Sequence, residues 1–160
     1  MKITLAKALK LKNRFANKIT ETSRSIHDYN SVIEGKERPV DINALIQKRE
    51  KLVDALINLK TAISYANAPV QKTIYLLAEL KGDVSFLRGI DTSSGKQMKS
   101  GIWGSDDKFY NTEAVLDYAT VKGLIEETEA SIDANQDVLD KHNHTVELDV
   151  DDEMFSLLRG

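Results

Sequence analysis

A loop bracketed by glycines, "GIDTSSGKQ" from Gly89 to Gln97, is the first candidate for chemistry because it is close in pattern to a phosphate-binding loop. Such a loop needs a glycine, four residues and then Gly-Lys-Ser/Thr, between a buried strand and a helix. Here five residues separate Gly89 from Gly95, and Gln97 replaces the hydroxyl residue that would bind magnesium. The segment also follows an expected helix. We therefore predict a helix end at Gly89 and a turn through residues 91–93, and no nucleotide site.

The second candidate is a metal site formed by His142 and His144. Alternate residues of a strand point to the same side, so two imidazoles at this spacing could bind zinc or nickel. A complete site needs a third protein ligand, and His27 is the only other histidine of the chain. His142 also fits a helical stripe, and a histidine near a helix C-terminus interacts favourably with the helix dipole. We expect His142 to pack against the protein at the end of a helix, and the metal site is the alternative.

The carboxylates lack the spacing of known catalytic or calcium-binding motifs. The tail "ELDVDDE" (147–153) has neither the glycine nor the ligand order of a calcium loop. "EETEASID" places Glu126 and Glu129 on one helical face without a histidine beside them. There is no G-x-S-x-G motif, and the absence of cysteine excludes disulfides and thiolate catalysis. We expect a non-enzymatic protein without catalytic residues and without a cofactor.

The elements that carry these residues are predicted to be helices, most clearly in the segment that follows Asp41. Asp41 suits the N-cap position, where its carboxylate accepts hydrogen bonds from the first free amides. The periodic positions recur at spacings of three and four, as in the a/d seam of a coiled coil. Arg49, the one charged member, is expected to reach the edge of the seam or to pair with an acid on a facing helix. The seam consists of Ile42, Leu45, Arg49, Leu52, Leu56, Leu59, Ile63 and Ala66.

The predicted fold is a single, mainly all-α domain over residues 1–160. It comprises two long antiparallel helical hairpins, or one four-helix bundle, with coiled-coil-like seams. Pro69 either begins the third helix or kinks one long helix made of the second and third. Asn111 or Thr112 is expected to cap the fourth helix. The expected helices span about 3–34, 41–67, 69–88 and 112–142, with a loop or β-hairpin insertion at 89–111 and an extended acidic tail at 143–160.

The insertion holds the only tryptophan, Trp103, close to Phe109 and Tyr110. A short hairpin is expected there, with "GSDD" (104–107) as its turn. We expect Trp103 to cap the open end of the bundle; the alternative is that it anchors a partner, because tryptophan is enriched at binding hot spots.

Charge is distributed unevenly along the chain, although the net charge is only −3. Residues 1–30 carry seven Lys or Arg and two acids, whereas residues 111–160 carry three Lys or Arg and thirteen acids. A basic first helix suggests nucleic acid, with binding driven by counterion release. The acidic fourth helix is available to neutralise that face, so we do not expect nucleic-acid binding. The lysines and arginines concerned are Lys7, Lys10, Lys12, Arg14 and Lys18.

No segment approaches the length of about 20 apolar residues that a membrane helix requires. The start, "MKITLAKALKLKNRF", has no apolar run of signal-peptide length. We therefore expect no membrane span and a cytoplasmic location.

Four segments together carry a family resemblance. "LAKALKLKNR", "LINLKTAISYAN", "LAELKGDVSFLRG" and "LDKHNHTVEL" occur in an order that resembles the septicolysin-like family of small bacterial proteins across nearly the whole chain. The resemblance implies a helical, oligomeric protein, and it supplies no catalytic motif. The family name suggests cytolysis, but no pore-forming segment is present in these residues, so that activity is not carried over.

The expected function is that of a helical interaction or assembly protein that works as a homo-oligomer, with a further protein partner left open. A thin helical hairpin cannot cover its own seams, which motivates this expectation. The alternatives are a ligand- or metal-binding module built on His142, His144 and residues 89–110, and nucleic-acid binding by the first helix. The expected interface residues are Leu45, Leu52, Leu56, Leu59, Ile63 and Trp103.

Overall fold

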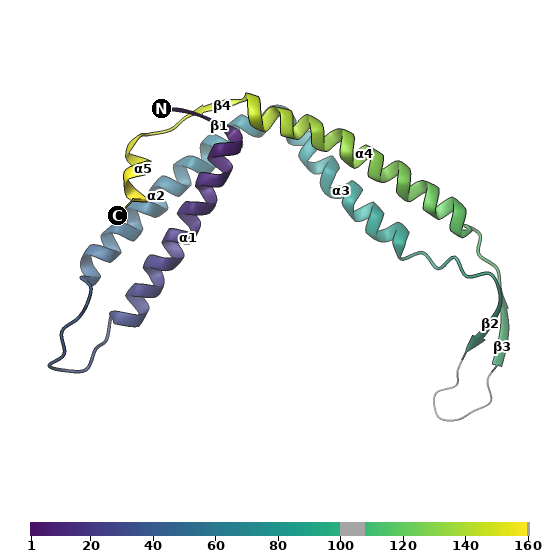
Figure 1. The fold of residues 1–160 in the computed structure, drawn as a ribbon, viewed down its shortest axis with the longest axis horizontal. Helices are drawn as coiled ribbons and strands as arrows, with labels where there is room; N and C mark the ends of the chain where they lie inside the picture. The colour runs from purple at the N-terminus through teal and green to yellow at the C-terminus, as the bar shows by residue number, and fades with distance from the viewer. Residues whose placement is uncertain (100–107, 160) are drawn as a thin grey trace. The chain divides into compact units, whose positions relative to one another are not determined.

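The computed structural model describes residues 1–99 and 108–159 and shows a mainly helical protein (Figure 1). Its contacts cluster in two compact units, where the sequence predicts one domain. The first, the α1–α2 unit, contains residues 1–71 and 140–160, and the second, the α3–α4 unit, contains residues 72–139. The elements in chain order are β1 (Lys2–Thr4), α1 (Leu5–Tyr29), α2 (Ile42–Asn67), a 3-10 turn η1 (Ala68–Val70), α3 (Gln71–Arg88), β2 (Gly95–Lys99), β3 (Lys108–Thr112), α4 (Tyr118–Thr145), β4 (Glu147–Asp149) and α5 (Glu153–Leu157).

Helices α1 and α2 form the expected antiparallel hairpin and lie side by side (Figure 1). Asp41 caps α2 as predicted, because its Oδ1 accepts a hydrogen bond from the amide of Ala44 at 3.1 Å. Helix α1 ends at Tyr29, earlier than the expected residue 34. The guanidinium of Arg38 folds back and donates to the carbonyls of Tyr29 and Asn30, at 3.0 and 3.2 Å. It thereby satisfies carbonyls that a helix end leaves unpaired.

The core of the α1–α2 unit lies between these two helices. The seam side chains Leu52, Leu59 and Ile63 of α2 are buried in it, and Leu56 packs against it. Arg49 is exposed at the edge of the seam, which is one of the two expected positions, and its Nε donates to the hydroxyl of Ser23 on α1 at 2.8 Å. The buried partners from the rest of the unit are Ile3, Leu5, Ala8, Leu11, Phe15, Ala55, Leu148, Val150 and Met154.

The end of the chain is more ordered than the expected extended tail. Helix α4 continues to Thr145, three residues beyond the expected end. Only β4 is a strand, and it pairs antiparallel with β1, with Ile3 opposite Leu148. Helix α5 follows and packs on α2, where Met154 is buried. The apolar residues of "VELDV" and "EMFSLL" therefore contribute to the core, which the acidic composition of the tail concealed.

In the α3–α4 unit the third helix ends where the sequence predicts, at Arg88 before Gly89. The link between α2 and α3 is the single 3-10 turn that contains Pro69, so helical structure continues from residue 42 to 88 without a loop. Helix α4 begins at Tyr118 instead of about 112. The predicted caps Asn111 and Thr112 are wrong, because both residues pair in a β-ladder instead.

The predicted β-hairpin in the insertion is confirmed. Strands β2 and β3 pair antiparallel, with Gln97 opposite Tyr110 and Met98 opposite Phe109. The Lys96 ammonium lies 4.5 Å from the centre of the Phe109 ring. The expected turn at 104–107 lies outside the described residues.

Candidate functional site

The two histidines proposed as metal ligands do not form a pair. His142 and His144 both lie in the last turn of α4, where residues two apart point to nearly opposite sides of the helix. His144 is exposed, whereas Nε2 of His142 lies 2.9 Å from the carbonyl oxygen of Ala66. This contact is the packed role that the sequence suggests for His142. Within the described ranges, no three His, Cys, Asp or Glu side chains are grouped closely enough to hold a metal ion.

Two carboxyl groups have lowered pKa values, and both serve local structure. Hydrogen bonds from the side chain and the backbone amide of Thr120 lower the pKa of Asp117, whose Oδ1 lies 2.7 Å from that amide at the start of α4. Hydrogen bonds from Ser93 in the same way lower the pKa of Asp91 in the segment after α3. Residues 91–93 have no regular turn, and the Asp91 carboxylate is occupied by the amide and hydroxyl of Ser93.

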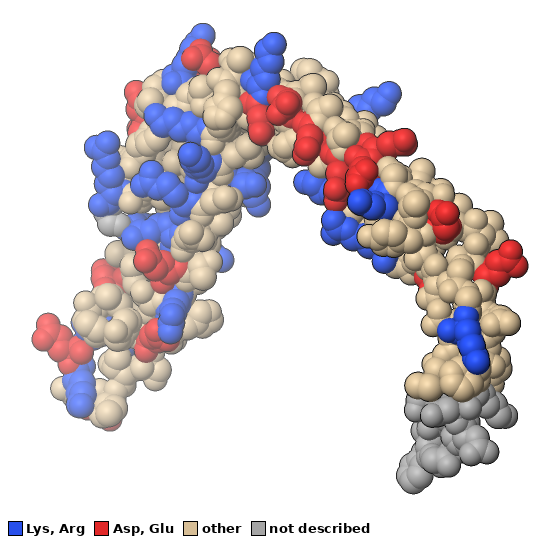
Figure 2. Space-filling view, turned by 45° about the vertical axis from the view of Figure 1, so that its right-hand side comes forward, with Lys and Arg blue, Asp and Glu red and all other residues tan. Residues whose placement is uncertain are grey.

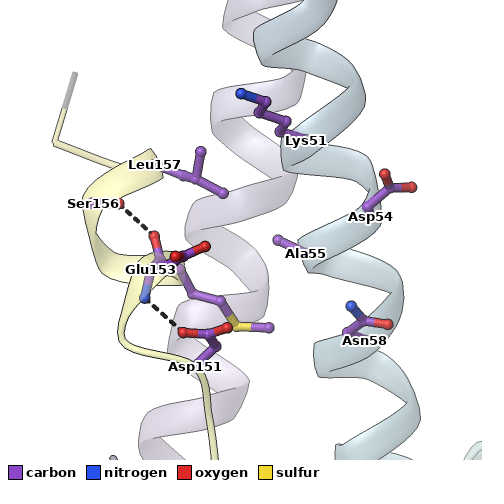
Figure 3. Close-up of a pocket in the computed structure, with 9 residues that line it drawn as sticks. Lys51, Asp54, Ala55, Asn58, Asp151, Glu153, Ser156 and Leu157 are labelled. Atoms are coloured by element: carbon purple, nitrogen blue, oxygen red, sulfur yellow. Dashed lines mark hydrogen bonds between the residues drawn. The ribbon is translucent and has the colours of Figure 1, made fainter.

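The α1–α2 unit has an open groove of about 510 Å³ between α2 and the end of the chain (Figure 3). Lys51, Asp54 and Asn58 line it from α2. On the other side, the carboxylate of Asp151 accepts a hydrogen bond from the amide of Glu153 at 2.9 Å. That carboxylate therefore holds the first turn of α5, and the groove lies between α5 and α2.

The basic side chains proposed for nucleic acid lie on α1. Lys7, Lys10 and Arg14 are exposed, and Lys18 makes an ion pair with Glu21 at 3.0 Å. Figure 2 shows Lys and Arg gathered over the α1–α2 unit, whereas Asp and Glu are frequent along α4. This arrangement is the charged face of an amphipathic helix.

The predicted interface residues have different positions from those expected. The seam of α2 is closed by α1 of the same chain, so Leu52, Leu59 and Ile63 are core residues of the single chain. Leu45 and Leu56 are partly buried beside them. Trp103 lies outside the described residues. The seam pattern was correctly identified, but spacing alone could not show that α1 is its partner.

The α3–α4 unit leaves more of its apolar side chains uncovered. Among its described residues only Leu77, Val84 and Val121 are buried. None of the unit's residues belongs to the core cluster. Its exposed large apolar side chains are Tyr75, Leu76, Phe86, Met98, Phe109, Tyr110, Val115, Leu116, Tyr118, Leu124 and Val138. Exposed apolar side chains mark an interaction site where they form a contiguous patch, whereas apolar side chains scattered singly over a surface are normal.

Sequence reasoning missed most residues of this surface, Leu76, Leu124 and Val138 among them. The available signal was that α3 and α4 carry more apolar residues than one stripe can hold. We take the surface of the α3–α4 unit as the candidate functional site.

Comparison with known proteins gives no match to a family model, to a curated protein or to a solved structure. In the part of the chain that the structure describes, no helix has the length and apolar character needed to cross a membrane.

Proposed function

We propose that this protein is a non-enzymatic helical assembly protein that works as a homo-oligomer. One observation carries the proposal: in the α3–α4 unit eleven described large apolar side chains are exposed and three are buried. Helices α1 and α2 instead share a buried core and leave four large apolar side chains exposed, Tyr29, Ile46, Ile57 and Tyr65. Exposed apolar surface is costly in water, by about 25 cal/mol for each Å² left uncovered. Covering it in an assembly removes that cost.

The α3–α4 unit also has too little internal packing to support itself. Two helices form one layer, and a stable domain needs at least two layers around a core. A unit of fewer than about 70 residues rarely gains sufficient stability from its own core. A second layer from another molecule would supply the missing cover.

The resemblance to the septicolysin-like family stays a prediction, and it implies the same oligomeric class. Neither the resemblance nor the site suggests a chemical reaction.

Sedimentation velocity of the full chain, from nanomolar to high micromolar protein, tests the proposal. We expect a species whose mass is a whole multiple of 17.9 kDa, in exchange with smaller species on dilution. A single species of 17.9 kDa at every concentration would contradict the proposed function.

A further inference from the structure

The α3–α4 unit has two unlike faces, and one of them is charged. Arg88 on α3 and Glu129 on α4 form an ion pair across this face at 2.7 Å. Lys81 and Asp133 line the same hollow of about 430 Å³. The arrangement fixes the direction of the helices, since residues late in α3 lie beside residues early in α4. The two helices are therefore antiparallel, as Figure 1 shows.

The opposite face is apolar and is shared by both helices. Successive residues of an α-helix are rotated by about 100° around its axis. One edge of α3, rotated by about 80° from the buried Leu77 and Val84, therefore consists of Leu76, Leu80 and Leu87. Leu124 and Val138 form the corresponding edge of α4. Because the helices are antiparallel, both edges lie on the same side of the pair, away from the Arg88–Glu129 ion pair. We call the surface formed by Leu76, Leu80, Leu87, Leu124 and Val138 the leucine face.

The leucine face is accessible in the isolated chain. Leu76, Leu124 and Val138 are 40%, 39% and 53% exposed, and Leu80 and Leu87 are partly buried. Asp83 and Glu127 are the charged residues at its margin. The face thus has apolar residues from both helices and a charged margin, with Ser131 of α4 midway between Leu124 and Val138.

We propose that the leucine face binds the same face of a second copy of this chain, with α3 of each molecule lying over α4 of its partner. The contact forms a four-helix bundle from two hairpins. It rests on the proposed homo-oligomeric function and specifies the surface and the geometry of the assembly.

The exposed area of the chain agrees with a contact of this size. The chain exposes 11780 Å². Two separate compact units of the same total mass would expose about 9,600 Å², by the usual scaling of surface with mass. The excess is roughly 2,000 Å² for the whole chain, the β2–β3 insertion included, whereas a standard interface buries about 800 Å² on each partner. One dimer contact therefore fits within the surface that this chain leaves uncovered.

Symmetry and charge select a second copy and the pairing of α3 with α4. A twofold axis lets one apolar face cover another of identical length, so both hairpins gain a second layer at once.

From Tyr118 to Leu139, α4 carries five acids and one lysine. Helix α3 carries three basic residues and two acids. Pairing α3 with the partner's α4 brings helices of opposite net charge together, whereas pairing α4 with α4 would place two acidic helices side by side. Most of these charges lie outside the leucine face, and Asp83 and Glu127 at its margin are both acidic.

The two most exposed aromatic residues of α3 do not offer an equivalent surface. Tyr75 and Phe86 are 65% and 69% exposed and lie on the side of α3 that points away from α4. Glu79 and Gly82 separate them along that side. They have no counterpart on α4, so they form a narrow strip on one helix and not a face of the hairpin. Phe86 is thus a matched control position.

Glutamate substitutions test the proposal by sedimentation velocity. We expect the double variant Leu76→Glu/Val138→Glu to weaken the dimer about a hundredfold or more, because it buries four charges in the proposed interface, two from each molecule. Phe86→Glu should sediment as the wild type. Far-UV circular dichroism identifies any variant that loses its helices. If the wild type is an oligomer and only Phe86→Glu dissociates it, the leucine face is not the interface, but the proposed homo-oligomeric function still holds. A monomeric wild type would overturn both.

Disulfide trapping tests the pairing without disturbing the fold, since the natural chain has no cysteine. Val84 and Ile132 line the same hollow, and Leu76 and Val138 each lie about two turns from them in the same direction. The proposed pairing therefore places Leu76 level with Val138 of the other molecule. On mixing Leu76→Cys and Val138→Cys proteins under oxidation, we expect the mixed disulfide to predominate. Predominance of the Val138→Cys homodimer would contradict the proposed pairing of α3 with α4. If no disulfide formed and the wild type bound only an unrelated protein, the proposed dimer itself would be contradicted.

Discussion

The α1–α2 pair and the α3–α4 pair are both antiparallel, and they differ in what covers their apolar side chains. The first pair packs closely and also receives β1, β4 and α5, so its seam faces a core. The second pair meets through three buried residues and an exposed ion pair. The difference shows that an apolar stripe predicts burial against a neighbouring element. The topology decides whether that element comes from the same chain.

The largest effect should come from the centre of the α1–α2 core. Leu59→Ala removes a fully buried side chain and should lower the free energy of unfolding by about 2–5 kcal/mol. Leu76→Ala, the matched change on the leucine face, should lower it by less than about 1 kcal/mol in dilute solution, where the side chain is already partly exposed. Urea unfolding followed by circular dichroism measures both. Equal losses would remove the contrast between the two pairs.

A smaller loss is expected at the end of the chain. Leu148 on β4 is buried opposite Ile3, so Leu148→Ala should cost about 2 kcal/mol, near the lower end for leucine because the strand lies at an edge. Asp149→Ala alters the exposed neighbouring residue and should change stability by less than about 0.5 kcal/mol. The same urea titration compares them. If Leu148→Ala behaved like Asp149→Ala, β4 would not belong to the core.

The start of α4 should respond to acid through Asp117. Its pKa is lowered in the folded protein, so its stabilising effect is present at neutral pH and disappears as the pH falls through that lowered value. Asp117→Ala should reduce helical content at neutral pH and remove part of the loss that acid causes in the wild type. Circular dichroism against pH measures this. Asp137→Ala, a change within α4, is the control; if it had the same effect as Asp117→Ala, capping would not be the cause.

The smallest effect is expected from the ion pair of the α3–α4 unit. Arg88 and Glu129 are both largely exposed, so their coupling in a double-mutant cycle should be below about 1 kcal/mol and should decrease in salt. Alanine at either position leaves the leucine face unchanged, so dimerisation should persist. A coupling of several kcal/mol would mean that this pair, and not a partner, holds α3 against α4.

Local rules predicted much of the fold from the sequence. Asp41 caps α2 through its own carboxylate, and α3 ends before Gly89, because both signals act within a few residues. Asn111 and Thr112 have equally good capping chemistry, yet their pairing with residues 95 and 96 across the insertion places them in a strand. The β1–β4 pairing joins the two ends of the chain and has no local signal.

The candidate site was less accessible to sequence reasoning. Leu80 and Leu87 belong to the apolar stripe of α3, but an edge can be told from a core position only when the direction of α4 is known. Leu52 and Leu59 are the opposite case: their stripe suggests an interface with another molecule, but α1 of the same chain packs against it. In both cases the missing information is the identity of the neighbouring helix.

Hydrogen exchange at several protein concentrations tests the central claim most directly, because it reports each helix separately. The account predicts that amides of α3 and of the first part of α4 exchange faster on dilution through the dissociation of the dimer, while those of α1 and α2 keep the same protection. Protection of α3 and α4 that does not depend on concentration would contradict it, since these helices would then be stable without a partner.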